Sequence, residues 1–294
     1  MPVQQAGKSA DNKPVVSFDD VRFAYPDEET LALDGVSLDV MPGECLAVIG
    51  PNGGGKSTLL LHMNALLIPD GGHVRVFVDG RELDSCNKRY LPEIRRACSM
   101  VFQNPDEQTV ASTVEEDVAF GPENLGLPRE ETRRRVDECL SMVGLDGFQE
   151  RMVFGLSRGQ RQRVAVAGAL AMRPAVLLCD EPTAMLDPSG RREVMETVER
   201  LHKEEGMTVV LITHFMDEAL RGDRVAVMEK GQIVLEGAPR QVFAQVDELK
   251  RIGLDVPPMM ELSQRLKKDG YDVGCEPMTV EEMVEALCRL KQKN

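Results

Sequence analysis

The sequence predicts an α/β fold with a parallel-sheet core, and three observations support this prediction. Residues 45–49 form a continuous apolar run, as in strands that are buried on both faces, and a glycine-rich turn follows it. Two further apolar runs occupy residues 175–179 and 208–212. Between these two runs, the apolar residues of 194–201 have helical spacing. Alternation of strand, helix and strand is typical of a parallel sheet.

Other segments alternate between apolar and polar residues, which indicates half-buried strands. Residues 16–25 and 36–40 alternate in this way before the first buried strand, so we expect an antiparallel β subdomain there. Late in the chain, residues 225–229 and 232–236 resemble a hairpin around Lys230-Gly231.

Residues 106–158 interrupt the α/β pattern with helical character. Thr113 and Glu116 have the spacing of a capping box, which marks the start of a helix. The apolar residues of 136–143 also recur at helical spacing. We therefore predict a helical subdomain at about 106–158 within a main domain of residues 15–237.

Both ends of the chain differ from this main domain. Residues 1–14 are polar and predict a disordered tail. After Gly237 the sequence is strongly charged, and Thr279 with Glu282 repeats the capping-box spacing before a helical apolar pattern. We predict that residues 238–294 form a small α/β C-terminal accessory domain.

Composition limits the possible functions. The net charge of −14 and the absence of Trp argue against binding to nucleic acid, whose phosphates attract basic surfaces. The seven cysteines are odd in number and lack C-x-x-C spacing, which favours free thiols in a reducing compartment over disulfides or a zinc site. Because no apolar stretch approaches 18 residues and the N-terminus does not resemble a signal peptide, any membrane role is expected to depend on a partner.

Residues 50–57 read G-P-N-G-G-G-K-S, which matches the phosphate-binding pattern G-x-x-x-x-G-K-[ST]. Glycines let backbone N–H groups approach phosphate oxygens, and the start of the following helix attracts anions. Lys56 would contact the β- and γ-phosphates, and Ser57 would bind Mg²⁺. The alternative is an incidental glycine-rich turn. The predicted nucleotide-binding residues of the motif are Gly50, Pro51, Asn52, Gly53, Gly54, Gly55, Lys56, Ser57 and Thr58.

Two adjacent carboxylates, Asp180 and Glu181, follow the apolar run of 175–179. The carboxyl ends of parallel strands are where α/β proteins place their chemistry. We expect Asp180 to hold Mg²⁺ and Glu181 to orient the attacking water. A solvated acidic turn is the alternative for this pair taken alone.

Several further motifs together resemble the ATP-binding cassette (ABC) family, in the family's order over residues 16–237. Residues 156–160, L-S-R-G-Q, resemble the signature motif, and V-F-Q-N-P contains a Q-loop glutamine, Gln103. Asp187 in A-M-L-D-P resembles the D-loop, and His214 the switch histidine. Tyr25 resembles the aromatic residue that stacks on adenine. Each of these residues also has a structural interpretation when it is considered alone. His214 could be a structural histidine, Tyr25 could be a core residue, and Ser157 could be an ordinary helix cap.

The resemblance implies a P-loop NTPase fold of the ABC type, with a RecA-like parallel-sheet core, an antiparallel β subdomain and a helical subdomain. It implies catalytic roles for Glu181, His214 and Gln103, with Mg²⁺ held by Ser57, Gln103 and Asp180. It also implies two cassettes arranged head to tail around ATP. The signature residues acting on the partner's ATP would be Ser157, Arg158, Gly159 and Gln160, with Asp187 in the D-loop.

Longer strings resemble the A-component ATPases (EcfA) of energy-coupling factor transporters, and more specifically the first of their two paralogues. They are E-E-D-V-A-F-G-P-E-N-L-G-L-P over 115–128, I-T-H-F-M-D-E-A over 212–219 and L-K-R-I-G-L-D-V-P over 249–257. This resemblance implies vitamin or transition-metal uptake at the cytoplasmic face of the cell membrane. The implied partners are a second ATPase subunit (a paralogue or a second copy), a transmembrane T component and, through the complex, a substrate-binding S component.

The chain departs from the family pattern at two positions: Arg158 replaces the first signature glycine, and Gly54 replaces a common serine. Arg158 leaves open a rival interpretation as a catalytically weak regulatory subunit. A second rival is an ABC ATPase of translation or DNA maintenance, but the chain lacks the second cassette and basic surface of those proteins. The remaining histidines, His62, His73 and His202, are given no role.

A run of acidic residues follows the Q-loop. Such a run is usually a solvated face, but in this family the region docks arginine-bearing helices of the T component. We therefore expect some of Asp106, Glu107, Glu115 and Glu116 to receive these arginines.

Overall fold

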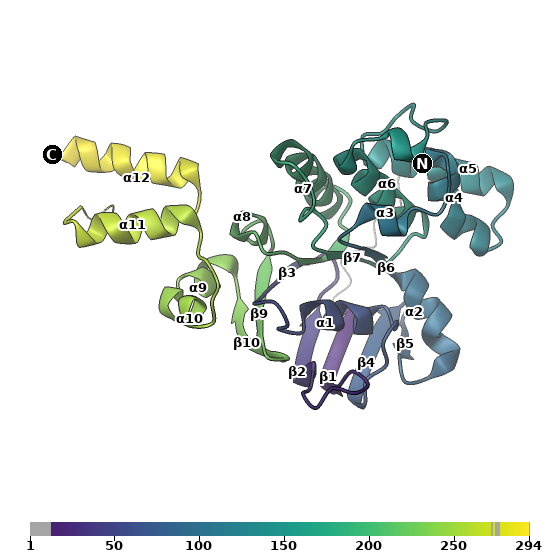
Figure 1. The fold of residues 1–294 in the computed structure, drawn as a ribbon, viewed down its shortest axis with the longest axis horizontal. Helices are drawn as coiled ribbons and strands as arrows, with labels where there is room; N and C mark the ends of the chain where they lie inside the picture. The colour runs from purple at the N-terminus through teal and green to yellow at the C-terminus, as the bar shows by residue number, and fades with distance from the viewer. Residues whose placement is uncertain (1–12, 272, 274–276, 294) are drawn as a thin grey trace.

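The computed structural model describes residues 13–271, 273 and 277–293, and its centre is a six-stranded sheet of order β10-β9-β3-β8-β7-β6 (Figure 1). The neighbouring pairs from β9 to β6 are parallel, whereas β10 runs antiparallel to β9. The strands are β3 (Cys45–Ile49), β6 (Cys98–Val101), β7 (Val176–Asp180), β8 (Thr208–Ile212), β9 (Arg224–Glu229) and β10 (Gln232–Gly237). The predicted buried strands and the late hairpin are thus confirmed.

Alternate residues of this sheet enter two different cores. Val176 and Leu178 of β7 face a core shared with α1 (Lys56–Met63), α2 (Leu91–Ala97) and the second sheet. Leu177 and Cys179 face the opposite core, which contains α6 (Arg158–Ala171) and α7 (Pro188–Lys203). Burial of both faces explains why the strands read as continuous apolar runs.

The second sheet is antiparallel and has the order β2-β1-β4-β5. Its strands are β1 (Val16–Phe23), β2 (Leu33–Val40), β4 (Gly71–Val78) and β5 (Arg81–Asp84). In β2 the residues Val36, Leu38 and Val40 are buried while their neighbours are exposed, because only one face packs on the core. The expected antiparallel β subdomain is therefore confirmed.

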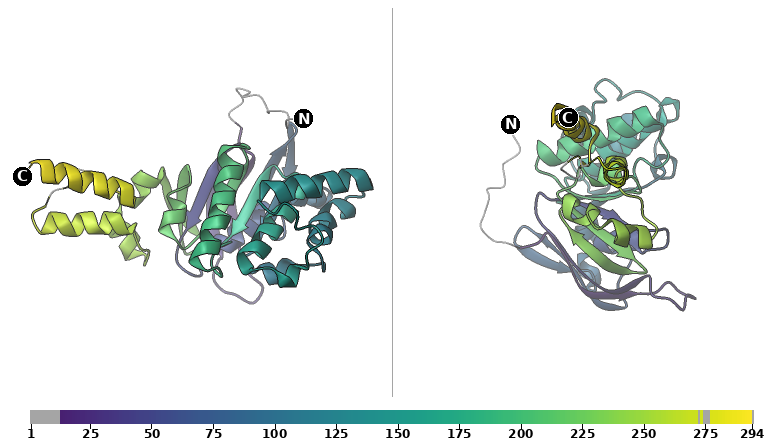
Figure 2. Two further views of the ribbon diagram at one scale, coloured as in Figure 1. Left: turned by 90° about the horizontal axis from the view of Figure 1, so that it is seen from above. Right: turned by 90° about the vertical axis from the view of Figure 1, so that its left-hand side faces the viewer.

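The predicted helical region contains α3 (Pro105–Gln108), α4 (Val114–Asn124), α5 (Arg129–Met142) and the short η2 (Val153–Gly155). Glu116 N donates to Thr113 Oγ1 at 3.4 Å, and Thr113 N donates to the Glu116 carboxylate at 3.2 Å, so the predicted capping box is present. Figure 1 and Figure 2 place these helices at one side of the central sheet and the C-terminal helices at the other.

All regular elements after Gly237 in the described residues are helices: α9 (Pro239–Phe243), α10 (Val246–Arg251), α11 (Pro258–Lys268) and α12 (Val280–Lys293). The α/β character predicted for this region is therefore wrong for these residues, because its apolar residues sit at helical spacing. Val242, Phe243 and Leu249 share a core with Ala47 and Ile49 of β3. In contrast, α11 and α12 project from the body as a pair (Figure 2). The predicted tail of residues 1–14 lies mostly outside the described residues.

Candidate nucleotide-binding site

The glycine-rich loop joins β3 to α1, as the sequence predicts. A Cβ atom on Gly50 would lie 2.2 Å from Met228 O of β9, so no other side chain fits without moving the backbone. Gly55 has φ +98° and caps α1, and a Cβ there would meet Ala32 O at 2.5 Å. The glycines thus allow the loop to lie tightly against the sheet edge, with the start of α1 open to an anion.

Lys56 is 5% exposed, and its ammonium is held by the loop itself. Its Nζ donates to Gly50 O and to Pro51 O, each at 2.9 Å. Burial lowers the pKa of Lys56, while the carboxylates of Glu181 and Asp180 oppose this shift. Phosphate oxygens would be stronger acceptors for this charge than the two neutral carbonyls.

Asp180 and Glu181 lie at the carboxyl end of β7 beside the loop. Ser57 Oγ donates to Asp180 Oδ1 at 3.1 Å. Burial raises the pKa of Asp180, and the hydrogen bond from Ser57 opposes that rise. Hydroxyl and carboxylate oxygens are the ligand type that Mg²⁺ prefers, so Ser57 and Asp180 fit the predicted metal role.

Glu181 brings two predicted catalytic residues together. Its Oε1 lies 2.6 Å from His214 Nε2, and its Oε2 accepts from Gln103 Nε2 at 3.3 Å. The Glu181 backbone has φ +47°, a strained value for a residue with a side chain. Such strain is often kept at functional sites, and here it coincides with a carboxylate aimed at two neighbouring loops.

Tyr25 borders the same cavity as the glycine-rich loop. This cavity has a volume of ≈ 330 Å³ and is lined by Tyr25, Thr30, Ala32, residues 52–58 and Glu181, among others. Tyr25 packs edge-on against Phe23, and its hydroxyl lies 3.1 Å from Thr58 Oγ1. The cavity thus has an aromatic side chain at one part of its wall and the phosphate loop at another.

The signature residues form the start of α6. Gln160 N donates to Ser157 Oγ at 3.2 Å, and Ser157 N donates to Gln160 Oε1 at 3.0 Å. This capping box leaves the positive end of the helix exposed. Arg158 is the first residue of α6 and has an exposed side chain.

The signature helix touches the D-loop helix through two glycines. Asp187 caps α7 by accepting from Gly190 N at 3.3 Å. A Cβ on Gly159 would lie 3.0 Å from Gly190 Cα, so the two helices meet at backbone distance. In the part of the chain that the structure describes, neither residues 157–160 nor Asp187 lines the cavity of the glycine-rich loop.

The comparisons with known proteins agree with this geometry. The family model described as "ABC transporter" matches residues 33–184. Curated relatives include the energy-coupling factor transporter ATP-binding protein EcfA1 of Clostridium perfringens, 52% identical over 281 residues, which cover 94% of this chain and 99% of the relative. EcfA1 of Symbiobacterium thermophilum is 55% identical over 284 residues, covering 94% and 98% of the two chains.

The chain belongs to the ABC transporter family, among its EcfA1-type ATP-binding proteins.

Solved structures of related cassettes share its fold. The structure of cbiO1 from C. perfringens, described as part of the ABC transporter complex cbiONQ, has a TM-score of 0.73 and 36% identity, covering 86% of this chain and 99% of the other. A dimeric cassette, MJ0796, bound to ADP and Pi has a TM-score of 0.66 and 33% identity, covering 76% and 99%.

These findings confirm the predicted family, the α/β cassette fold and the function as an ABC ATPase of an energy-coupling factor transporter, with ATP hydrolysis coupled to transport. None of the described helices of this EcfA1-type chain combines the length and hydrophobicity that a membrane span requires. The roles of individual residues remain predictions.

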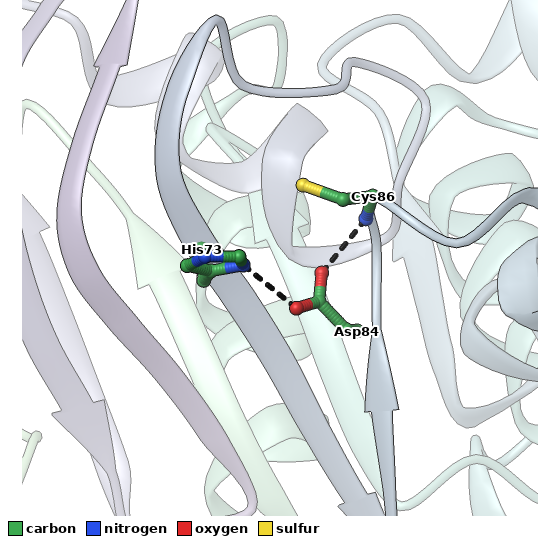
Figure 3. Close-up of side chains that lie close together, drawn as sticks. All are labelled: His73, Asp84 and Cys86. Atoms are coloured by element: carbon green, nitrogen blue, oxygen red, sulfur yellow. Dashed lines mark hydrogen bonds and ion pairs between the residues drawn. The ribbon is translucent and has the colours of Figure 1, made fainter.

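One group of potential metal ligands in this cassette was not found from the sequence. His73 of β4, Asp84 of β5 and Cys86 place their ligand atoms within 4.8 Å of one another (Figure 3). The pairing of β4 with β5 brings the three side chains together. The spacing of the cysteines in the sequence did not indicate such a group. Asp84 Oδ2 lies 2.7 Å from His73 Nδ1, and Oδ1 accepts from Cys86 N at 2.8 Å. Because one carboxylate oxygen is occupied by His73 of the neighbouring strand and the other by the backbone of Cys86, we assign the group a structural role.

Proposed function

We propose that this chain binds ATP and Mg²⁺ in the cavity of the glycine-rich loop and hydrolyses ATP within a head-to-tail pair of cassettes. One observation carries the proposal. A single subunit contains both the phosphate loop and the capped start of α6. Among the described residues, however, residues 157–160 do not line the cavity beside the phosphate loop. A second cassette facing the first would supply the missing helix end. The dimeric relative bound to ADP and Pi supports such a pairing.

Within the cavity, Tyr25 would stack on adenine, and the backbone N–H groups of residues 52–58 would surround the phosphates. Lys56 would exchange its carbonyl partners for phosphate oxygens. Ser57 and Asp180, with Gln103, would hold Mg²⁺. When bound, this ion would neutralise charge that develops on the phosphate oxygens.

Glu181 is the proposed residue that orients and activates the attacking water. A carboxylate that is held between two neighbours loses little orientational freedom when the water binds. His214 and Gln103 serve as these neighbours, at 2.6 Å and 3.3 Å. Hydrolysis would remove the γ-phosphate that joins the two cassettes, and the pair would open.

The second ATPase subunit would be a paralogue or a second copy of this chain. The projecting pair α11 and α12 supports a role of the C-terminal region in this pairing. It carries exposed apolar side chains, which are Leu262, Val280, Val284 and Leu287. Exposed apolar groups on a projecting element are typical of contact surfaces.

The transmembrane T component would dock beside the Q-loop, which would place the chain at the cytoplasmic face of the membrane. Three of the four acidic candidates already have partners: Asp106 pairs with Arg161 at 3.0 Å, Glu107 accepts from Asn104 at 2.8 Å, and Glu116 belongs to the capping box. We therefore assign the main docking role to Glu115. The transported molecule, whether a vitamin or a metal ion, would be chosen by the S component.

The proposal is tested with Glu181→Gln in the full chain. This variant should bind ATP with unchanged affinity, hydrolyse it on the order of a hundredfold more slowly, and accumulate as an ATP-dependent dimer with itself or its paralogue. Equilibrium nucleotide binding, phosphate release and size-exclusion chromatography measure these properties. Normal turnover in this variant would refute the role of Glu181, and ATP hydrolysis by a persistent monomer would refute the paired site.

A further inference from the structure

Glu218 is a buried carboxylate that the proposed mechanism does not use. It lies on the short helix α8 (Met216–Ala219) and is 1% exposed. An ionised carboxylate is found in such a position when hydrogen bonds or opposite charges compensate for the loss of water.

Three donors provide this compensation. Glu218 Oε1 accepts from Thr183 Oγ1 and from Arg191 Nε, each at 2.7 Å. Its Oε2 accepts from Thr213 Oγ1 at 2.6 Å. The contact with Arg191 is an ion pair, and both threonines are themselves almost fully buried. Hydrogen bonds in such a dry environment are strong and strictly oriented.

The three donors come from three segments of the proposed site. Thr183 lies two residues after Glu181, and Thr213 directly precedes His214. Arg191 lies in the first turn of α7, four residues after Asp187. Glu218 is therefore the common acceptor for the segments that carry the proposed base, the switch histidine and the D-loop.

Arg191 strengthens this connection on the exposed side. Its guanidinium lies 3.6 Å from the centre of the Phe215 ring and also pairs with Asp217 at 2.5 Å. Phe215 N in turn donates to Thr213 Oγ1 at 3.0 Å. The residues on both sides of His214 are thus fixed by contacts that lead to Glu218 or Arg191.

We infer that Glu218 is a positioning residue for ATP hydrolysis, which holds Glu181 and His214 at hydrogen-bonding distance and fixes the D-loop relative to them. This inference rests on the proposed function of Glu181. Glu218 does not reach the nucleotide cavity, since it is absent from the cavity lining. Its removal should therefore reduce kcat and leave ATP affinity unchanged.

The test uses the variants Glu218→Gln and Thr213→Val in the full chain. Thr213→Ser serves as the conservative variant that keeps the hydroxyl. Glu218→Gln removes the charge, and Thr213→Val removes one hydroxyl with little change in shape. Both should lower kcat by at least about tenfold, because displacement of a catalytic group by a fraction of an ångström is sufficient for such a loss. Thr213→Ser keeps the hydroxyl and should restore kcat to within about threefold of the unmutated chain.

Thr132→Val is a matched control. Thr132 is also buried, lies on α5, and its hydroxyl has no hydrogen-bond partner among the described residues. This variant should have normal kcat. Thermal unfolding of all variants shows whether they fold.

Three results would overturn the inference: normal kcat in both Glu218→Gln and Thr213→Val, equal loss in Thr213→Ser and Thr213→Val, or ATP affinity that falls in parallel with kcat. The last two would indicate a packing role. If Glu181→Gln abolishes turnover while Glu218→Gln does not, only this inference fails. If Glu181→Gln keeps normal turnover, the proposed function itself fails.

Discussion

The Nε2 atom of His214 lies 2.6 Å from Oε1 of Glu181, although the two residues follow different strands of the central sheet. Adjacent parallel strands β7 and β8 end at the same sheet edge and thereby bring the two side chains together.

Replacement of His214 by alanine should lower ATP turnover on the order of a hundredfold, because the proposed base loses one of the two groups that hold it. ATP affinity should stay within about twofold, since the phosphates are bound chiefly by the glycine-rich loop. Phosphate release and equilibrium nucleotide binding measure the two quantities. His73→Ala, on the antiparallel sheet, is the control and should have normal turnover. An equal loss of ATP turnover in His214→Ala and His73→Ala would argue against a catalytic role of His214.

Two inactive variants should restore activity to each other when mixed. Lys56→Ala disables the phosphate loop, and Ser157→Arg blocks the start of α6 that faces the neighbour's nucleotide. In a mixed dimer one of the two composite sites keeps both intact parts. If the chain pairs with itself, an equal mixture should recover about a quarter of the normal rate, since half of the random pairs are mixed and each has one working site. A mixture as inactive as its components would contradict the head-to-tail site in a homodimer.

Gly159→Ala should weaken both stability and turnover. The added methyl would lie 3.0 Å from Gly190 Cα, and the resulting overpacking costs about 1–3 kcal/mol of unfolding free energy. Gly168→Ala, on the same helix, is the control. Its methyl would meet nothing closer than 3.9 Å, so better helix propensity should stabilise the chain by up to about 1 kcal/mol. Thermal unfolding and phosphate release measure both variants. Equal changes in stability and turnover in Gly159→Ala and Gly168→Ala would show that the contact between Gly159 and Gly190 contributes to neither property.

Thiol alkylation should distinguish buried from exposed cysteines. Burial raises the pKa of Cys45, Cys98 and Cys139 to about 12, so at pH 8 these thiols are protonated as well as inaccessible. Cys86 and Cys288 are exposed and should react. The pKa of Cys86 is raised by partial burial and by Asp84, so its thiolate fraction and its rate of reaction should increase as the pH rises. Peptide mass spectrometry after brief labelling measures this pattern, and rapid labelling of Cys98 in the folded chain would contradict the described core.

Charge reversal of Glu115 should weaken retention of the transmembrane partner. Its carboxylate is partly exposed and lies in the first turn of α4, in the acidic segment that follows the Q-loop in sequence. In the variant, the proposed arginine of the T component would lose its ion pair. Co-purification should therefore decrease in Glu115→Arg and not in Glu130→Arg at the start of α5. ATP binding by the isolated chain should be the same in both. Unchanged co-purification of Glu115→Arg would remove this residue from the docking surface.

The sequence predicted the parts of this molecule that depend on local pattern. Buried strands such as residues 45–49 and 208–212 could be located because burial on both faces requires continuous apolar residues. The capping box at Thr113 and the helix cap at Ser157 could be predicted because caps need particular residue types at fixed positions.

Features that depend on contacts between distant segments were not visible in advance. The role of Glu218 arises only when α8, β8 and α7 meet, and nothing in the local sequence separates it from a surface glutamate. The close approach of Gly159 to Gly190 also requires knowledge of how α6 packs on α7. The C-terminal region was predicted to be α/β, whereas its described elements are helices; α9 and α10 are only 5 and 6 residues long and give too few turns for a clear periodic signal.

The position of Phe243 limits how the chain can be shortened. Its side chain is fully buried and packs with Ala47, Ile49 and Val225 beneath the sheet. A truncation at Gly237 would therefore uncover the strand that leads into the phosphate loop, even though every motif residue would remain. The same core continues past α10 with Ile252, Leu254, Val256 and Met260. Deletions and exchanges of the C-terminal region between relatives should accordingly begin beyond Met260, so that the strands of the phosphate loop keep their apolar cover.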